Sequence, residues 1–88
     1  MDSSTEPGAS DPIKAVVEII ARALVDHPDA VKVTENERRG LKVYSLTTAP
    51  GDMGKIIGRQ GRTAAALRTL VALTAEKHGT RAQLDIRD

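Results

Sequence analysis

Residues 54–62 read Gly54-Lys55-Ile56-Ile57-Gly58-Arg59-Gln60-Gly61-Arg62, and this stretch decides how the rest of the chain is interpreted. Two apolar β-branched residues lead into a pair of glycines three positions apart, with basic side chains before, between and after them. Glycine accepts a positive φ and has no Cβ to hold a ligand away from the backbone. A helix that starts just after the glycines would add the unpaired N–H groups and the dipole of its first turn. The stretch therefore predicts a phosphate-binding loop between two helices.

The candidate binding residues have distinct roles in this prediction. The two glycines shape the turn, so that the backbone N–H groups of residues 59–62 face a phosphate. The arginines neutralise neighbouring phosphates, and the lysine lies within reach on the helix before the loop. One isoleucine forms an apolar surface for a base while the other fixes the short helix to the core, and either assignment fits the sequence. The predicted site residues are Lys55, Ile56, Ile57, Gly58, Arg59, Gln60, Gly61 and Arg62.

The positive charge of the chain is concentrated around this loop. The formal net charge is only +1. Residues 1–30 hold two basic and six acidic side chains, whereas residues 53–75 hold four basic side chains and no acid. A local positive field attracts a polyanion even when the overall balance is near neutral. We therefore expect a nucleic-acid partner.

Hydrophobic periodicity and turn signals predict helices and strands on both sides of the loop. Small polar residues over 1–10 predict a flexible tail, which leaves one domain over 11–88. The predicted elements are a helix over 12–25, a strand over 30–34, a polar turn over 35–40, a strand over 41–48, a short helix that opens at 49–52 and ends at Ile57, a long helix over 62–78 and a strand over 81–87.

The spacing of apolar residues also predicts which faces are buried. In the first strand Val31 and Val33 point to the helices, but in the second strand either Leu41 and Val43 or Tyr44 and Leu46 fit that role. The predicted inward residues of the first helix are Ile13, Val16, Val17, Ile20 and Leu24, those of the long helix are Thr63, Ala66, Leu67, Leu70, Val71 and Thr74, and those of the last strand are Ala82, Leu84 and Ile86.

The segment Ile57-Gly58-Arg59-Gln60-Gly61 resembles the Ile-Gly-x-x-Gly signature of the KH domain family. The predicted element order resembles the type II variant, in which an extra helix and strand precede the core. The resemblance implies an α+β fold, with a three-stranded sheet packed against three helices in the order α-β-β-α-α-β. It also implies that the GxxG loop at 58–61 clamps about four single-stranded nucleotides. Gln60 departs from the more basic loops common in the family, which implies modest affinity.

Two further segments extend the resemblance to the KhpA family of small, stand-alone bacterial KH proteins. These segments are Asp26-His27-Pro28-Asp29 and residues 50–62. The resemblance implies an RNA-binding or RNA-chaperone role, as a homodimer or as a heterodimer with a larger KH protein of the KhpB kind. Arg38 and Arg39 fall on the turn that corresponds to the family's variable loop, where they would close the far side of an RNA groove.

Composition argues against several other functions. The chain has one tyrosine and no phenylalanine or tryptophan, so it cannot build an aromatic platform for stacked bases. It has no cysteine, and its two histidines are better explained as turn and capping residues. We therefore expect no catalytic residue, cofactor, metal site or small-molecule substrate. With no apolar run that could span a bilayer and no signal peptide, we expect a cytoplasmic protein without a membrane partner.

Two alternatives to RNA binding follow from the same residues. A helix-turn-helix could place residues 62–78 in a DNA groove, although that helix offers mostly alanine beyond Arg62, Thr63 and Arg68. A protein-interaction module without RNA binding would have no need of the cations around the loop.

The outer face of the long helix carries small residues that allow close approach of a second helix and are compatible with pairing, namely Ala65 and Ala72, with Leu73 nearby. Small residues there can equally reflect helix propensity.

Overall fold

A computed structural model describes residues 11–87, and the predicted tail at residues 1–10 lies outside this range. The predicted order of helices and strands is confirmed, with single 3₁₀ turns added at Pro28–Ala30 and Arg59–Gly61. The elements are α1 (Pro12–Leu24), β1 (Lys32–Arg38), β2 (Leu41–Thr47), α2 (Met53–Ile57), α3 (Arg62–Lys77) and β3 (Arg81–Ile86).

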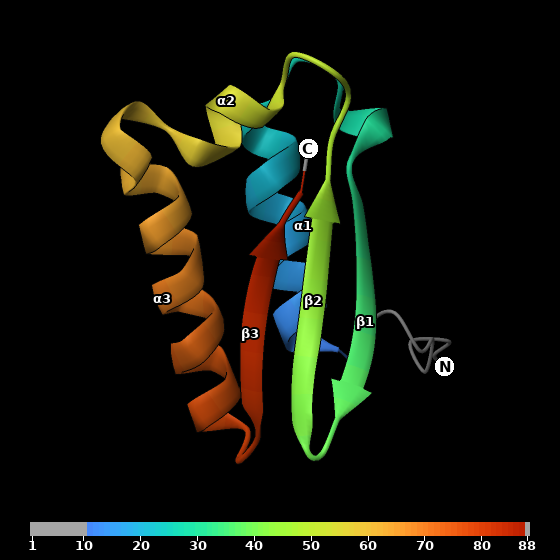
Figure 1. Cartoon of the computed structure of the whole chain (residues 1–88), viewed down its shortest axis with the longest axis vertical. Helices are drawn as coiled ribbons and strands as arrows, with labels where there is room; N and C mark the ends of the chain where they lie inside the picture. The colour runs from blue at the N-terminus through green and yellow to red at the C-terminus, as the bar shows by residue number, and fades with distance from the viewer. Residues whose placement is uncertain (1–10, 88) are drawn as a thin grey trace, which may run out of the picture.

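The three strands form one mixed sheet with β2 in the centre. β1 and β2 are an antiparallel hairpin, and β3 runs parallel to β2 on the other side. Parallel neighbours need a long crossover, and α2, the glycine loop and α3 provide it. Figure 1 shows α1 behind the sheet and α3 beside β3, so the helices form a second layer. The predicted α+β class is confirmed.

The core lies between the sheet and the helices, and the burial of its residues shows which side chains of β2 point inward. Tyr44 and Leu46 have no exposed surface, so these two point inward and Leu41 and Val43 point away. Small alanines were missed in both long helices, because the prediction followed the larger apolar residues. The buried residues are Ile13, Val17 and Ala21 in α1, and Ala64, Leu67, Val71 and Ala75 in α3.

Three residues predicted to point inward are exposed instead. Leu24 in α1 is 39% exposed, and Leu70 and Ala66 in α3 are also on the surface. In α3 the buried stripe is rotated toward Ala64 and Ala75, because small side chains let the helix approach the sheet closely. The prediction for these three residues was wrong.

The predicted boundary of β1 was also wrong. The prediction ended the strand at residue 34 and made 35–40 a turn, but β1 continues to Arg38, which pairs with Leu41. Only Arg39 and Gly40 remain for the turn, with φ of 53° and 83°. Positive φ at both central residues defines a type I′ hairpin. The polar residues that suggested a turn lie on an edge strand, where polar side chains are tolerated.

Tyr44 ties the central strand to the start of α1. The carboxylate of Asp11 accepts hydrogen bonds from the backbone N–H groups of Ile13 and Lys14, both at 3.1 Å, and so caps the helix. The hydroxyl of Tyr44 donates to the same carboxylate at 3.2 Å. Burial, together with the charges of Asp11 and Glu35, raises the pKa of the Tyr44 phenol far above its usual value. The phenol therefore stays neutral and remains a donor.

The hairpin turn gives a stability prediction. Arg39 holds a positive φ that asparagine adopts at lower cost, and asparagine is favoured at the first central position of a type I′ turn. Arg39→Asn should stabilise the fold by roughly 0.5 kcal/mol, a rise in Tm of roughly 2–4 °C for a domain of this size. Thermal unfolding measures the shift. Arg38→Asn, which changes the same residue type within β1, should give no gain, and equal effects of the two substitutions would contradict the assignment of strain to Arg39.

Candidate nucleic-acid interface

The glycine loop is a sharp reversal between α2 and α3. Gly58 ends α2 with φ of 76°, and Gly61 precedes α3 with φ of 73°. Between them Gln60 also has a positive φ of 59°. The turn is closed by two hydrogen bonds, from Gly58 N–H to the carbonyl of Gly54 at 2.9 Å and from Gly61 N–H to the carbonyl of Gly58 at 3.1 Å.

The two glycines are required for different reasons. A Cβ on Gly58 would collide with Thr63, since it would lie within 2.6 Å of Thr63 Cβ and also overlap its hydroxyl oxygen. A Cβ on Gly61 would meet no atom within 4 Å. Gly58 therefore lets the first turn of α3 pack onto the end of α2, whereas Gly61 only needs its left-handed conformation.

Fewer backbone amides of the loop lack a hydrogen-bond acceptor than the sequence predicted. Gly61 N–H donates to Gly58 and Arg62 N–H donates to the carbonyl of Arg59. Among the hydrogen bonds of residues 11–87, none is donated to a carbonyl by the amides of Arg59 or Gln60. These two amides are the ones left to meet an anion.

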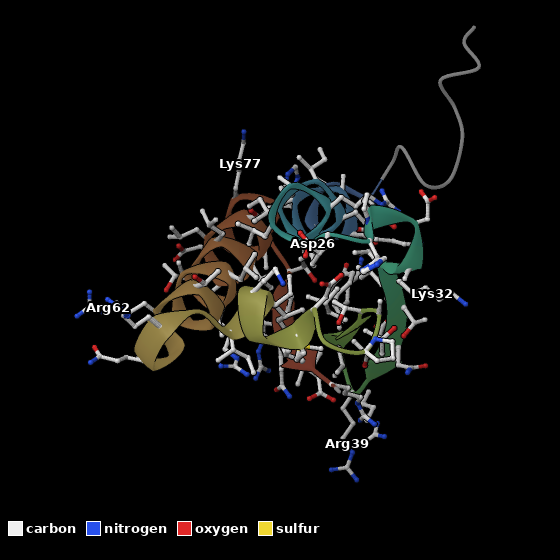
Figure 2. The ribbon with its side chains drawn as sticks, turned by 90° about the horizontal axis from the view of Figure 1, so that it is seen from above. Asp26, Lys32, Arg39, Arg62 and Lys77 are labelled. Atoms are coloured by element: carbon white, nitrogen blue, oxygen red, sulfur yellow. The ribbon has the colours of Figure 1, made fainter. Side chains whose placement is uncertain are left out.

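Two arginines give the loop its positive charge. The side chains of Arg59 and Arg62 are exposed, and Figure 2 shows Arg62 pointing away from the fold. Within the described part of the chain, neither forms an ion pair. Their charge is therefore available to a ligand rather than neutralised by a carboxylate.

Lys55 is placed differently from these arginines. Its Nζ lies 3.3 Å from a carboxylate oxygen of Asp26 and 3.6 Å from one of Asp52. The hydrogen bond and charge of Asp26, with a further contribution from Asp52, raise the pKa of Lys55 above its usual value. The lysine stays charged, but two carboxylates offset its attraction for a phosphate.

Asp52 is a buried carboxylate that joins α2 to the segment after α1. Only 2% of its surface is exposed. One of its oxygens accepts from the backbone N–H of His27 at 3.0 Å and lies 3.1 Å from His27 Nδ1. Burial alone would raise the pKa of Asp52, but the hydrogen bonds from the side chain and backbone of His27 outweigh it and hold the pKa below its usual value. The carboxylate is therefore ionised and holds the start of α2 in place.

The two isoleucines and the two hairpin arginines are also placed by the structure. Ile56 is fully buried, whereas Ile57 is 42% exposed beside the glycines, so Ile57 is the one available to a base.

Arg38 and Arg39 lie at the opposite end of the sheet from α2. The seven residues of β2 separate the two ends by about 20 Å. The structure therefore does not bring the hairpin arginines to the loop.

Sequence reasoning missed the residues that support the site. The contact of Thr63 with Gly58 and the contact of Asp52 with His27 form only when the chain is folded, and the side chain of Arg68 is turned to the sheet, where its Nε donates to the carbonyl of Leu84 at 3.5 Å. In residues 11–87 no cluster of three His, Cys, Asp or Glu side chains is placed to hold a metal ion. In the same range no helix has the length and apolar character needed to cross a bilayer.

The helix and strand order, the mixed sheet and the Ile-Gly-x-x-Gly loop together define a KH domain of type II. Residues 14–86 match the sequence profile described as KhpA/KhpB, KH domain, and the chain belongs to this family.

Several relatives match most of the chain. RNA-binding protein KhpA of Halalkalibacterium halodurans is 51% identical over 76 residues, covering 86% of this chain and 100% of that protein. The protein of the same name from Caldanaerobacter subterraneus subsp. tengcongensis is 49% identical, covering 81% of this chain and 95% of its own length. The one from Treponema pallidum is 47% identical, covering 83% and 91%.

The contrast between the two glycines can be tested by matched alanine substitutions. Gly61→Ala should cost roughly 1–2 kcal/mol of unfolding free energy, because a Cβ in the left-handed region is the only penalty. Gly58→Ala should cost more, because Gly58, with φ of 76° and ψ of 171°, has a conformation almost restricted to glycine, and a Cβ there would also collide with Thr63. Urea unfolding measures both. Equal losses would contradict the added cost at Gly58.

Proposed function

We propose that this protein binds single-stranded RNA by gripping the phosphate backbone at the Gly58–Gly61 loop. The observation that carries the proposal is an exposed turn in which the amides of Arg59 and Gln60 meet no carbonyl and the side chains of Arg59 and Arg62 meet no carboxylate within the described residues. The relatives that match most of this chain are named RNA-binding proteins, which supports the choice of ligand.

In the proposed mode, a phosphate lies against the amides of Arg59 and Gln60. Arg59 and Arg62 neutralise this phosphate and its neighbour. Gly58 and Gly61 give the backbone its turn. The exposed side chain of Ile57 contacts a base. Lys55 and Ile56 hold α2 in position rather than contacting the strand. Phosphate contacts fix position and carry little base information. We therefore propose weak binding with low sequence specificity, suited to an RNA chaperone or post-transcriptional regulator.

The proposed protein is a binding module and not an enzyme. Such a module needs no cofactor, metal, membrane or small-molecule substrate, and we place it in the cytoplasm with its RNA. We assign the function to one domain over residues 11–88. Recognition of duplex DNA by α3 is not favoured, because Ala65 and Ala66 occupy exposed positions near the start of that helix, where a groove-reading helix displays polar side chains.

Reversing the charge of the loop tests the proposal. Arg59→Asp with Gln60→Asp should lower affinity for a fluorescent single-stranded oligoribonucleotide by roughly tenfold or more, since charged hydrogen bonds to phosphate are replaced by repulsion. Both positions are exposed, so circular dichroism should be unchanged. Arg22→Asp on α1 with Thr69→Asp on α3 changes the charge equally at exposed positions of the helix layer and should keep full affinity. Retained binding in the loop variant would remove the proposed site.

The salt dependence of the same titration tests the number of contacts. For a four-nucleotide strand, which occupies the loop alone, two neutralised phosphates predict a slope of log K against log salt of about −1.4, and a third contact from Lys55 would make it about −2. Excess duplex DNA should compete poorly with bound single-stranded RNA. Efficient displacement by duplex DNA would favour the helix-turn-helix alternative.

We also propose pairing of the protein through the outer face of its helices, either with a second copy or with a larger KH protein of the KhpB kind. The exposed fraction is 67% for Ile19 on α1 and 55% for Leu73 on α3, and the neighbouring Leu70 is also exposed. Apolar side chains gathered on one face support association. The loop lies at the end of α3 and stays accessible in such a pair.

Charge placed in this apolar face should abolish self-association. Ile19→Glu with Leu73→Glu is expected to give a monomer at concentrations where the unmodified chain is a dimer, as measured by light scattering coupled to size exclusion. Thr34→Glu with Asn36→Glu on β1 is the control and should leave the mass unchanged. A monomeric unmodified chain would exclude the homodimer and leave only the pairing with a different KH protein.

A further inference from the structure

One face of the sheet is covered by no helix in the described residues, and Figure 1 shows it toward the viewer. Tyr44 and Leu46 point from β2 into the core, so the alternate residues of β2 point to the open face. Cross-strand partners share a face, which places the partners of those residues on the open side too. The register therefore defines the surface residue by residue.

Next to the hairpin turn, two arginines with a leucine between them form a row across this face. Arg38 pairs with Leu41, and Leu41 pairs with Arg81, so the three side chains stand side by side across all three strands. The outer two are about 10 Å apart, twice the spacing of neighbouring strands. Arg39 adds a further cation at the turn, and Figure 2 shows it pointing away from the helices. We call Arg38, Arg39, Leu41 and Arg81 the hairpin patch.

The charge of the hairpin patch is not neutralised by the rest of the fold. Its three arginines are exposed and form no ion pair within residues 11–87. The carboxylate that shares the open face on β3 is Asp85, and it accepts from Arg87 Nε at 2.7 Å. The patch is therefore a concentrated positive surface about 20 Å from the glycine loop, at the other end of the seven residues of β2.

The row next to the patch offers groups that suit bases. Asn36 pairs with Val43, and Val43 pairs with Gln83, which puts a side-chain amide on each side of a partly exposed valine. Amides both donate and accept hydrogen bonds, so they serve any base without selecting strongly among them. Cations beside amides and a small apolar surface match a nucleic-acid strand more closely than a bare counter-ion.

We propose that the hairpin patch is a second contact site for single-stranded RNA, separate from the glycine loop. The inference rests on the proposed function, because the same strand would run from the loop across the open face to the patch. Arg38 and Arg81 would each hold a phosphate, with Asn36 and Gln83 beside the bases. This gives the hairpin arginines a role at a site of their own rather than as the far wall of the loop groove.

A protein ligand fits this face less well. Within the described residues, the large apolar side chains with substantial exposure are Ile19, Leu24, Ile57, Leu70 and Leu73, and all of them are on the helices. A stable protein interface needs a broad apolar centre, whereas the only apolar side chain of the hairpin patch is the partly buried Leu41 between its arginines. Its charge and polarity are those of nucleic-acid surfaces.

RNA length separates the two sites. A strand of about four nucleotides occupies the loop alone, whereas one of about twelve has the roughly six nucleotides that cover 20 Å at about 3.4 Å each, as well as the nucleotides held at each end. We expect Arg38→Gln with Arg81→Gln to weaken binding of a twelve-nucleotide oligouridylate about threefold to tenfold. The salt slope for this oligomer should become shallower by about 1.4, the value for two lost phosphate contacts. The four-nucleotide affinity should not change.

The control is Arg22→Gln with Lys77→Gln, which removes the same charge from the helix layer and should leave both affinities unchanged. If the patch variant binds both oligomers as tightly as the unmodified chain, the second site does not exist. If the control weakens the longer oligomer equally, the effect is overall charge and the inference is also overturned. If neither oligomer binds the unmodified chain, the proposed function itself falls, and the second site falls with it.

Discussion

The position of the glycine loop depends on one buried carboxylate. Asp52 lies at the start of α2, and instead of capping that helix it accepts hydrogen bonds from His27, which follows α1. Lys55, one turn later, joins Asp52 to Asp26 on the same connection. A helix of five residues is too short to be stable by itself, so these contacts and the burial of Ile56 hold it. These contacts therefore also fix the position of the glycine loop that follows α2.

The need to hold α2 in place explains why the basic side chains around the loop have two different roles. The cation before the glycines, Lys55, lies at the surface beside two carboxylates, whereas the cations after the first glycine, Arg59 and Arg62, have no such partner in the described residues. Close packing of Thr63 against Gly58 then fixes the angle at which α3 leaves the turn. Rigidity comes from buried or paired groups and affinity from unpaired ones, so the two properties of the site are carried by different residues.

Much of this arrangement was predictable from local patterns. The order of elements, the α+β class and the glycine turn all follow from periodicity, proline and glycine, which act over a few residues. The length of β1 was not predictable from local patterns. Its second half has the polar composition of a turn and becomes a strand only by pairing with β2, as Glu35, Asn36 and Glu37 show. The facing of α3 was missed because alanine gives a weak hydrophobic signal. The ion pair of Lys55 with Asp26 was missed because Asp26 is distant in sequence, although Asp52, the second partner of Lys55, lies only three residues before it. Contacts between remote segments leave no local trace.

The seclusion of Tyr44 has an optical consequence. It is the single aromatic side chain of the whole sequence, it has no exposed surface, and its hydroxyl donates to a carboxylate. Near-ultraviolet absorbance, near-ultraviolet dichroism and intrinsic fluorescence of the protein therefore all originate from one ring in the core, and none from the loop or the hairpin turn. A spectrum of the protein consequently reports whether the interior is intact and is blind to events on the surface, which separates a damaged fold from a damaged contact without an added fluorophore.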